Sequence, residues 1–383
     1  MIVFLALFSS ATGFAQTIPT SAPYAILVDY ESGMVLFEKS ADSLMEPAST
    51  AKIMTAELVF HELAAGRLKL DDTFPVSENA WRKGGGVAGG SSMFAVVNSR
   101  IAIEDLLRGL IIESGNDAAI ALAEGVAGTE DAFATLMTRR ANDLEMTKST
   151  FANPWGKSDP EQRVTARDMA HLAAHIIRTY PQYYHYFGEK DFTWNKIHQM
   201  NRNPLLTMEL GADGLKTGDI KESGFGLVGS AVQNGQRLIL VLNGLKSANE
   251  RAEEARRILN WGFRSFDRKT LFSETDIIGT AKVFGGSVNE VGLVSNKPIT
   301  LLLPRTSGDK LIGKLTYMGP LIAPVEQGNE VAKLRLYRGN ALVQETPLFT
   351  ASSVNVGSLT QRSIDAGLEL GLTLFRQMVQ KSK

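Results

Sequence analysis

A change in hydrophobic periodicity separates two kinds of structure within the first 268 residues of this chain. Helical spacing predominates from about Ser49 onward, whereas GLKTG, FGLVGSAVQ and RLILVLNGL have the pattern of consecutive strands. The dipeptide Asn234-Gly235 between the last two is typical of a two-residue hairpin turn. Strands joined by hairpins run antiparallel. The pattern therefore predicts an antiparallel sheet with helices, an α+β domain that ends near residue 268.

Shorter patterns predict the other elements of this domain. Residues 24–40 contain two strand patterns separated by a Ser-Gly turn. Apolar residues at helical spacing predict helices in IEDLLRGLII, DAAIALAEGVAG, EDAFATLMTRRANDLEM, TARDMAHLAAHII and ERAEEARRILNWGFRSF. A glycine-rich loop is expected at residues 83–92, and the segment ESGND breaks a helical run.

A second domain of different composition is predicted after residue 275. The helical patterns end there, and short strand patterns alternate with Gly, Pro and Asn turns. The strand patterns are ITLLLP, LIGKLTYM, VAKLRLYR and ALVQETPLF. We expect a small all-β domain over residues 275–357.

The last residues, 360–383, predict an amphipathic helix. Its apolar residues at helix-face spacing are Ile364, Leu368, Leu372, Phe375 and Val379, and its cations near the end are Arg376, Lys381 and Lys383. Such a helix can lie in a membrane interface with its cations near the lipid headgroups. It can equally pack on its own β domain, and the pattern does not distinguish the two.

The first 15 residues are apolar and then small, which is the pattern of a signal peptide cleaved after Ala15. The usual positive residues before the apolar stretch are missing, and the run is too short to span a bilayer. We expect residues 1–15 to be a signal peptide, and a buried N-terminal segment is the alternative.

Composition excludes several classes of function. The 383 residues include no cysteine, so disulfides, cysteine-type zinc sites and thiol catalysis are ruled out. The net charge of −1 argues against a nucleic-acid partner, whose phosphates require a basic surface. The five histidines lack metal-ligand spacing, because His171 and His175 have no third ligand. No metal or cofactor is predicted.

Three short motifs occur in an order and context that suggest nucleophilic catalysis. They are Ser49-x-x-Lys52, Ser114-Gly115-Asn116 and Lys216-Thr217-Gly218. The first lies on a predicted helix, where a spacing of three places both side chains on one face. The second lies at a helix break and the third on a predicted strand. Each motif alone is weak, but this set is described for penicillin-binding proteins and class A β-lactamases.

The chain resembles the D-alanyl-D-alanine carboxypeptidases, the low-molecular-mass penicillin-binding proteins of the peptidase S11 family. The similar stretches, in family order, are PASTAKIMT, ENAW, IIESGNDAAIALAE, FANPWG, TARDMA, NRNPLL, DGLKTG and WGFRSF. The resemblance runs from about residue 22 to the C-terminus. It implies a serine β-lactamase/penicillin-binding-protein-like transpeptidase domain over residues 22–268, followed by the small β domain.

The resemblance also implies a location and a substrate. In this family the amphipathic tail anchors the exported enzyme to the outer, periplasmic face of the cytoplasmic membrane. The expected reaction removes the terminal D-alanine from peptidoglycan stem pentapeptides and so regulates cross-linking. β-Lactam antibiotics would acylate and inhibit the enzyme.

Residue chemistry assigns expected roles within the motifs. Ser49 would attack the carbonyl between the two D-alanines and form an acyl-enzyme. Lys52 would be the base, because burial and the cation Lys216 would lower its pKa. Ser114 would relay a proton to the leaving amine. Asn116 would orient Lys52 and hold a substrate amide, although an asparagine there could also be a plain helix cap.

Substrate binding requires donors for an oxyanion and for a carboxylate. By resemblance, the oxyanion donors are the backbone N–H groups of Ser49 and of Asp219, which follows Gly218. The candidates to bind the terminal carboxylate are Lys216, Thr217, Arg202 and Arg251. Arg202 is chosen by family position, and a structural ion pair is its alternative role. Trp155 and Trp194 are expected to be packing residues.

The sequence departs from the family pattern at three places. Asp219 and Ile220 follow Lys-Thr-Gly, where the family often has His, Tyr or Phe and then Thr. A carboxylate there is electrostatically unfavourable for binding an anionic substrate. Lys157 replaces the usual Leu, and the glycine-rich loop is longer. These differences concern efficiency and substrate range rather than the reaction class.

Other functions remain open from the sequence. A β-lactamase-like hydrolase would need a glutamate for deacylation, and residues 150–170 contain no E-x-x-L-N pattern. A non-catalytic peptidoglycan-binding or shape protein could retain the fold, but it would not need the complete motifs. A Ser-His-Asp hydrolase is disfavoured because no Gly-x-Ser-x-Gly motif marks a nucleophile elbow.

Overall fold

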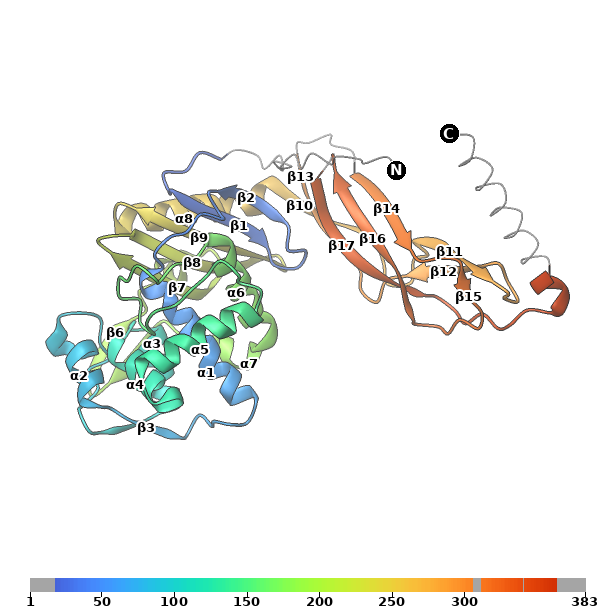
Figure 1. Cartoon of the computed structure of the whole chain (residues 1–383). Helices are drawn as coiled ribbons and strands as arrows, with labels where there is room; N and C mark the ends of the chain where they lie inside the picture. Colours follow the sequence, from blue (N-terminus) through green and yellow to red (C-terminus); the bar gives the residue numbers. More distant parts are fainter. Residues whose placement is uncertain (1–17, 306–310, 340, 364–383) are drawn as a thin grey trace, which may run out of the picture. The chain divides into compact units, whose positions relative to one another are not determined.

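The computed structural model of this chain describes residues 18–305, 311–339 and 341–363. It divides into two compact units, with the boundary between Ser265 and Phe266 (Figure 1). The signal peptide expected at residues 1–15 lies outside the described residues. So does the helix expected at 360–383, apart from residues 360–363, which are helical.

A five-stranded antiparallel sheet forms the centre of the first unit. Its order is β2-β1-β9-β8-β7, so β7 is an edge strand. The strands are β1 (Tyr24–Asp29), β2 (Val35–Lys39), β7 (Ala212–Ile220), β8 (Gly224–Gln233) and β9 (Gln236–Leu245). The two predicted strands near the N-terminus and the three consecutive strands with their Asn-Gly turn are therefore confirmed.

Helices cover both faces of this sheet. The helix α8 (Ala248–Ser265) packs on one face, and α6 (Ala166–Thr179) packs on the other (Figure 1). Along β1 successive side chains point to opposite faces of the sheet. Leu27 faces Gly262 of α8, whereas Ile26 belongs to the apolar core on the opposite side.

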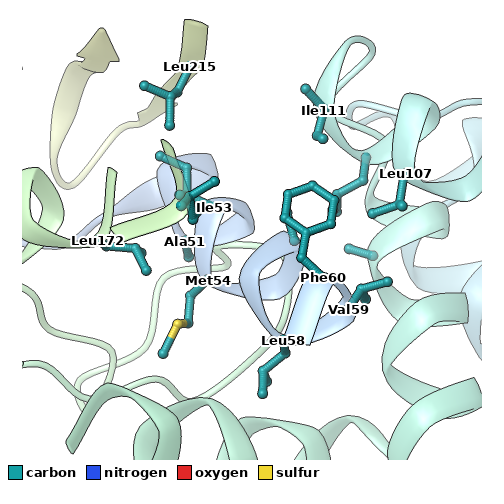
Figure 2. Packing of buried hydrophobic residues seen from close by; sticks show 14 of the residues in the cluster. Ala51, Ile53, Met54, Leu58, Val59, Phe60, Leu107, Ile111, Leu172 and Leu215 are labelled. Atoms are coloured by element: carbon teal, nitrogen blue, oxygen red, sulfur yellow. The ribbon is translucent and has the colours of Figure 1, made fainter. Parts of the chain in front are cut away.

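The helix α1 (Lys52–Ala64) runs through that core, and each of its first nine residues is buried. Figure 2 shows Ile53, Met54, Val59 and Phe60 of α1 among apolar residues of neighbouring elements. The neighbouring helices are α3 (Ile103–Ile111), α4 (Asn116–Ala127) and α5 (Glu130–Asp143). Because a helix surrounded by apolar partners is held on all sides, α1 is a rigid support for the residues at its N-terminus.

Several short elements were not predicted. They are β3 (Thr73–Pro75), α2 (Glu78–Gly84), β4 (Arg100–Ala102), α7 (Pro181–Tyr184), β5 (Asp191–Trp194), β6 (Ile197–Met200) and four 3-10 turns. The loop expected to begin at residue 83 begins later, since α2 extends to Gly84 and residues 86–88 form a 3-10 turn. Gly84 allows α2 to approach α4 closely, because a Cβ there would lie 2.3 Å from the backbone nitrogen of Asp117.

The second unit is composed of strands. A pair, β10 (Phe266–Phe272) and β13 (Ile299–Pro304), accompanies a six-stranded sheet of order β14-β16-β17-β12-β11-β15. The strands of that sheet are β11 (Gly279–Phe284), β12 (Glu290–Val294), β14 (Leu311–Tyr317), β15 (Leu321–Ile322), β16 (Glu330–Arg338) and β17 (Ala341–Thr350). The predicted all-β character is confirmed.

The predicted boundary between the two units requires a correction. Residues 266–268 were assigned to the first domain, and the β domain was expected to begin at residue 275. In the structure β10 already begins at Phe266, which pairs with Pro304 of β13. The helical pattern of α8 runs directly into this strand without a linker, so no turn or composition change marks the transition.

Candidate active site

Ser49 and Lys52 lie where a 3-10 turn (Ala48–Ala51) passes into α1. The Nζ of Lys52 lies 2.9 Å from the Oγ of Ser49. The turn approaches its neighbours closely, since a Cβ on Gly156 would lie 2.0 Å from the carbonyl oxygen of Ala48. Lys52 is only 1% exposed, and Ser49 is half-buried.

The Lys52 amine has three neighbours within hydrogen-bond distance. It donates to the Oδ1 of Asn116 at 2.8 Å and to the backbone oxygen of Trp155 at 2.6 Å, and Ser49 is the third. The first two are oxygens that can only accept. A neutral amine has two N–H groups and one lone pair, so those two acceptors use both N–H groups. The lone pair is then left for the hydroxyl proton of Ser49.

The surroundings favour the neutral form of Lys52. Burial and the nearby cations Lys216 and Arg202 hold its pKa well below the usual range, and only Asp117 opposes them. Burial is the largest cause, followed by Lys216. The predicted direction and both predicted causes are therefore confirmed.

The second motif lies in the break between α3 and α4. Asn116 is the first residue of α4, and Gly115 is its N-cap. The interpretation of Asn116 as a plain cap is wrong, because its side chain binds Lys52. Ser114 is 2% exposed and has a positive φ of 60°. Within the described structure its hydroxyl makes no hydrogen bond to Ser49 or Lys52.

Asp117 supports this break and was not singled out from the sequence. Its buried carboxylate accepts hydrogen bonds from the Ser92 hydroxyl and from the backbone nitrogens of Met93 and Ala95. It thereby ties the segment that follows the glycine-rich loop to the start of α4. The only signal in the sequence is its place directly after Ser-Gly-Asn.

The third motif lies on the edge strand β7. Lys216 and Thr217 are both buried. Burial, with Arg202 and Arg251, lowers the pKa of Lys216 to about 7, although Asp219 opposes the change. A Cβ on Gly218 would lie 2.9 Å from the backbone nitrogens of both Ser49 and Thr50. The glycine therefore lets β7 approach the start of α1.

The two candidate arginines differ in their surroundings. Arg202 is exposed, donates to the Ser91 hydroxyl at 2.7 Å and makes no ion pair with any described residue. The alternative of a structural ion pair is therefore wrong for Arg202. Arg251 is 7% exposed, and its guanidinium lies over the Phe225 ring with its Nε unpartnered. The charge of Asp219 acts on both Lys216 and Arg251.

The loop after α5 contributes a group that sequence reasoning missed. Trp155 was expected only to pack, but its backbone oxygen accepts from Lys52. The Asn153 side chain accepts from the backbone nitrogens of Gly156 and Lys157, and Gln162 accepts from those of Ala152 and Asn153. A backbone carbonyl leaves no trace in the sequence, so only the polar residues of FANPWGKSDPEQ could have hinted at a braced loop.

Neither a metal cluster nor a membrane-spanning helix is found among the described residues. Among them no group of three or more His, Cys, Asp or Glu could hold a metal ion. No helix in the described ranges is long and apolar enough to cross a membrane.

Comparison with known proteins identifies relatives over most of the chain. Residues 12–247 match the family model for D-alanyl-D-alanine carboxypeptidase, and residues 266–356 match the C-terminal domain of penicillin-binding protein 5. The carboxypeptidase DacC of Escherichia coli is 38% identical, covering 94% of this chain and 92% of its own. DacA of the same organism is 33% identical, with 89% and 85% covered.

Solved structures agree with these relatives. Penicillin-binding protein 5 from Haemophilus influenzae has a TM-score of 0.79 at 32% identity, covering 88% of this chain and 99% of its own. Penicillin-binding protein D2 from Listeria monocytogenes, in its ampicillin-bound form, has a TM-score of 0.58 at 27% identity, covering 65% and 100%. The predicted fold class is confirmed for both units. The chain belongs to the D-alanyl-D-alanine carboxypeptidase family of serine peptidases, peptidase S11.

Proposed function

We propose that this enzyme removes the terminal D-alanine from peptidoglycan stem pentapeptides through an acyl-enzyme on Ser49. The observation that supports this most directly is the arrangement around Lys52. Its two N–H groups are used by Asn116 and Trp155, and its lone pair is left for the Ser49 hydroxyl. A buried amine with a lowered pKa beside a hydroxyl has the properties of a general base and its nucleophile.

In the acylation step, Ser49 Oγ attacks the carbonyl carbon between the two D-alanines while Lys52 takes the hydroxyl proton. The oxyanion accepts hydrogen bonds from the backbone N–H groups of Ser49 and Asp219. The C–N bond then breaks, and the leaving amine receives a proton from Lys52 through the Ser114 hydroxyl. Water attacks the resulting ester, which releases the shortened peptide and restores Ser49.

The terminal carboxylate of the substrate binds near the cations of the site. Lys216 and Thr217 on β7 are close in sequence to Asp219, the proposed oxyanion donor. The exposed guanidinium of Arg202 makes no ion pair with a carboxylate of the described residues. Arg251 contributes charge from a more buried position. Because Asp219 interacts with Lys216 and Arg251, its charge is partly offset, which reduces the repulsion expected from the sequence.

β-Lactams are proposed to acylate the same serine. Their strained amide presents a carbonyl that Ser49 would attack as it attacks the peptide, and one structural neighbour is known in an ampicillin-bound form. The enzyme is further proposed to be exported to the periplasm. There residues 360–383 would hold it on the outer face of the cytoplasmic membrane.

The activity test is release of D-alanine from a synthetic peptide that ends in D-Ala-D-Ala. We expect turnover by the unmodified chain and a loss of at least about 1,000-fold in Ser49→Ala, because the acyl-enzyme route is then closed. Hydrolysis of benzylpenicillin without release of D-alanine would favour a β-lactamase. Inertness towards both substrates would favour a binding protein.

A further inference from the structure

Trp155 connects the proposed general base to a second polar cluster. Its backbone oxygen accepts a hydrogen bond from Lys52 at 2.6 Å, and its indole Nε1 donates to the Oε2 of Glu130 at 3.0 Å. One residue thus has one hydrogen bond to the base and another to a carboxylate on α5.

The environment of Glu130 keeps its carboxylate ionised. Its Oε1 accepts from Lys83 at 2.8 Å and from Asn79 at 3.0 Å. Burial favours the neutral acid, but the hydrogen bonds from Lys83, Asn79 and Trp155 outweigh it, and the pKa of Glu130 is lowered. Glu130 is also the first residue of α5, where the helix dipole favours an anion. The indole therefore donates to a charged acceptor, which makes a strong hydrogen bond.

Trp155 packs against the apolar core and also borders a hollow. The residue is half-buried, and it borders a hollow of about 360 Å³ that Glu130, Lys83, Lys157 and Asp159 also line. At this hollow the hydrogen bond to Glu130 fixes the direction of the indole N–H.

The helix α2 donates hydrogen bonds to Glu130, and the segment that follows α2 approaches Asn116, the other acceptor of Lys52. Asn79 and Lys83 belong to α2. In the segment after α2, a Cβ on Gly90 would lie 3.0 Å from the Nδ2 of Asn116. The segment 78–90 therefore contacts Asn116 at one end and, through Glu130, the Trp155 loop at the other.

We propose that Glu130 is a positioning residue of the reaction, which orients Trp155 and so holds the carbonyl that takes one N–H of Lys52. The inference rests on the roles proposed above for Ser49 and Lys52. If this carbonyl turns away, the freed N–H can point at Ser49 Oγ, and the lone pair no longer faces the hydroxyl proton. Acylation would then slow even though the fold is intact.

The test compares Glu130→Gln and Trp155→Phe in the full-length protein. The measurement is the rate constant of acylation by benzylpenicillin as a function of pH, with thermal unfolding to establish that each variant is folded. We expect the plateau rate to fall about tenfold in each variant, a part of the 10²–10⁴-fold contribution of a general base. The acid limb should move to lower pH, because losing a carbonyl acceptor destabilises the ammonium form of Lys52. If Glu130 had a purely structural role, the acid limb of the acylation rate would stay at the same pH.

The double variant and a matched control separate this account from others. Glu130→Gln with Trp155→Phe should be no slower than the slower single variant, because both substitutions act on the same hydrogen bond: Gln leaves one neutral amide oxygen for three donors, and Phe removes the indole donor. Arg82→Met is the matched control on α2, because it removes an exposed ion pair with Glu78 and none of the hydrogen bonds that Glu130 accepts, so its rate should change less than about threefold.

Two results would overturn the inference. The first is that both single variants are acylated at the wild-type rate with the wild-type pH profile. The second is that the loss of acylation rate in the double variant equals the product of the losses in the two single variants. In either case labelling of Ser49 in the unmodified chain would leave the proposed function standing. Absence of any labelling in the unmodified chain would instead contradict the proposed function itself.

Discussion

At the scale of single residues, Lys52 lies where an ammonium group is poorly stabilised. Burial removes its hydration, and two nearby cations, Lys216 and Arg202, repel its positive charge. The carbonyl groups of Asn116 and Trp155 accept hydrogen bonds but carry no full negative charge. The site therefore holds an amine that can take a proton from Ser49 near neutral pH.

Lys216 predicts an upper pH limit for peptide turnover. Its pKa of about 7 means that the free enzyme loses this ammonium as the pH rises through about 7. Since the ammonium is proposed to bind the substrate carboxylate, kcat/KM for a D-Ala-D-Ala peptide should fall on that side. Arginine remains protonated, so Lys216→Arg should move the alkaline limb upward, with a lower maximum. An unchanged alkaline limb in this variant would exclude Lys216 as its source.

The motif residues that contact Lys52 through side chains could be recognised in the sequence, whereas the backbone carbonyl that contacts it could not. Ser49, Lys52, Asn116 and Lys216 carry distinctive chemistry in recognisable motifs, and the structure brings the first three into hydrogen-bond contact. The carbonyl of Trp155 contributes as much to the geometry of Lys52. Any residue has a carbonyl, so no residue type at that position could have revealed it.

At the scale of elements, the site forms where three segments converge on the start of α1. They are the edge strand β7, the break between α3 and α4, and the loop around Trp155. Close approach of backbones requires glycine at the contacts. Gly218 provides this for β7 and Gly156 for the loop.

Gly218→Ala tests the contact between β7 and the start of α1. The added Cβ would lie 2.9 Å from two backbone nitrogens, so the strand or the turn must shift by several tenths of an ångström. Because productive geometry is sensitive to such shifts, we expect acylation to slow about tenfold or more. Gly313→Ala is the control, since its nearest contact would be an ordinary 3.5 Å. Equal acylation rates in Gly218→Ala and Gly313→Ala would show that acylation does not depend on the close approach of β7 to the start of α1.

Long periodic elements were predictable, whereas short ones depended on tertiary contacts. The strands β8 and β9 and the helices α5 and α6 have ten or more residues with a clear period. Helix α2 has seven residues, and β3 and β4 have three each, too few to show a period. Gly84 at the end of α2 looked like part of a flexible loop, but it packs against α4.

At the scale of the whole molecule, the described residues of the proposed site all lie in the unit of residues 15–265. The second unit has its own apolar core, which includes Leu293, Leu334 and Leu348. The change from mixed to all-β structure was predictable from the loss of helical periodicity. Its position was not, because α8 continues without a break into β10 at Phe266.

The central claim is that Ser49 is the acylated nucleophile, and intact mass tests it most directly. The full-length protein and Ser49→Ala would each be weighed after incubation with benzylpenicillin. We predict that the unmodified chain gains the mass of one benzylpenicillin and that Ser49→Ala gains nothing. An adduct of equal extent on Ser49→Ala, or no adduct on the unmodified chain under conditions where it releases D-alanine, would contradict the account.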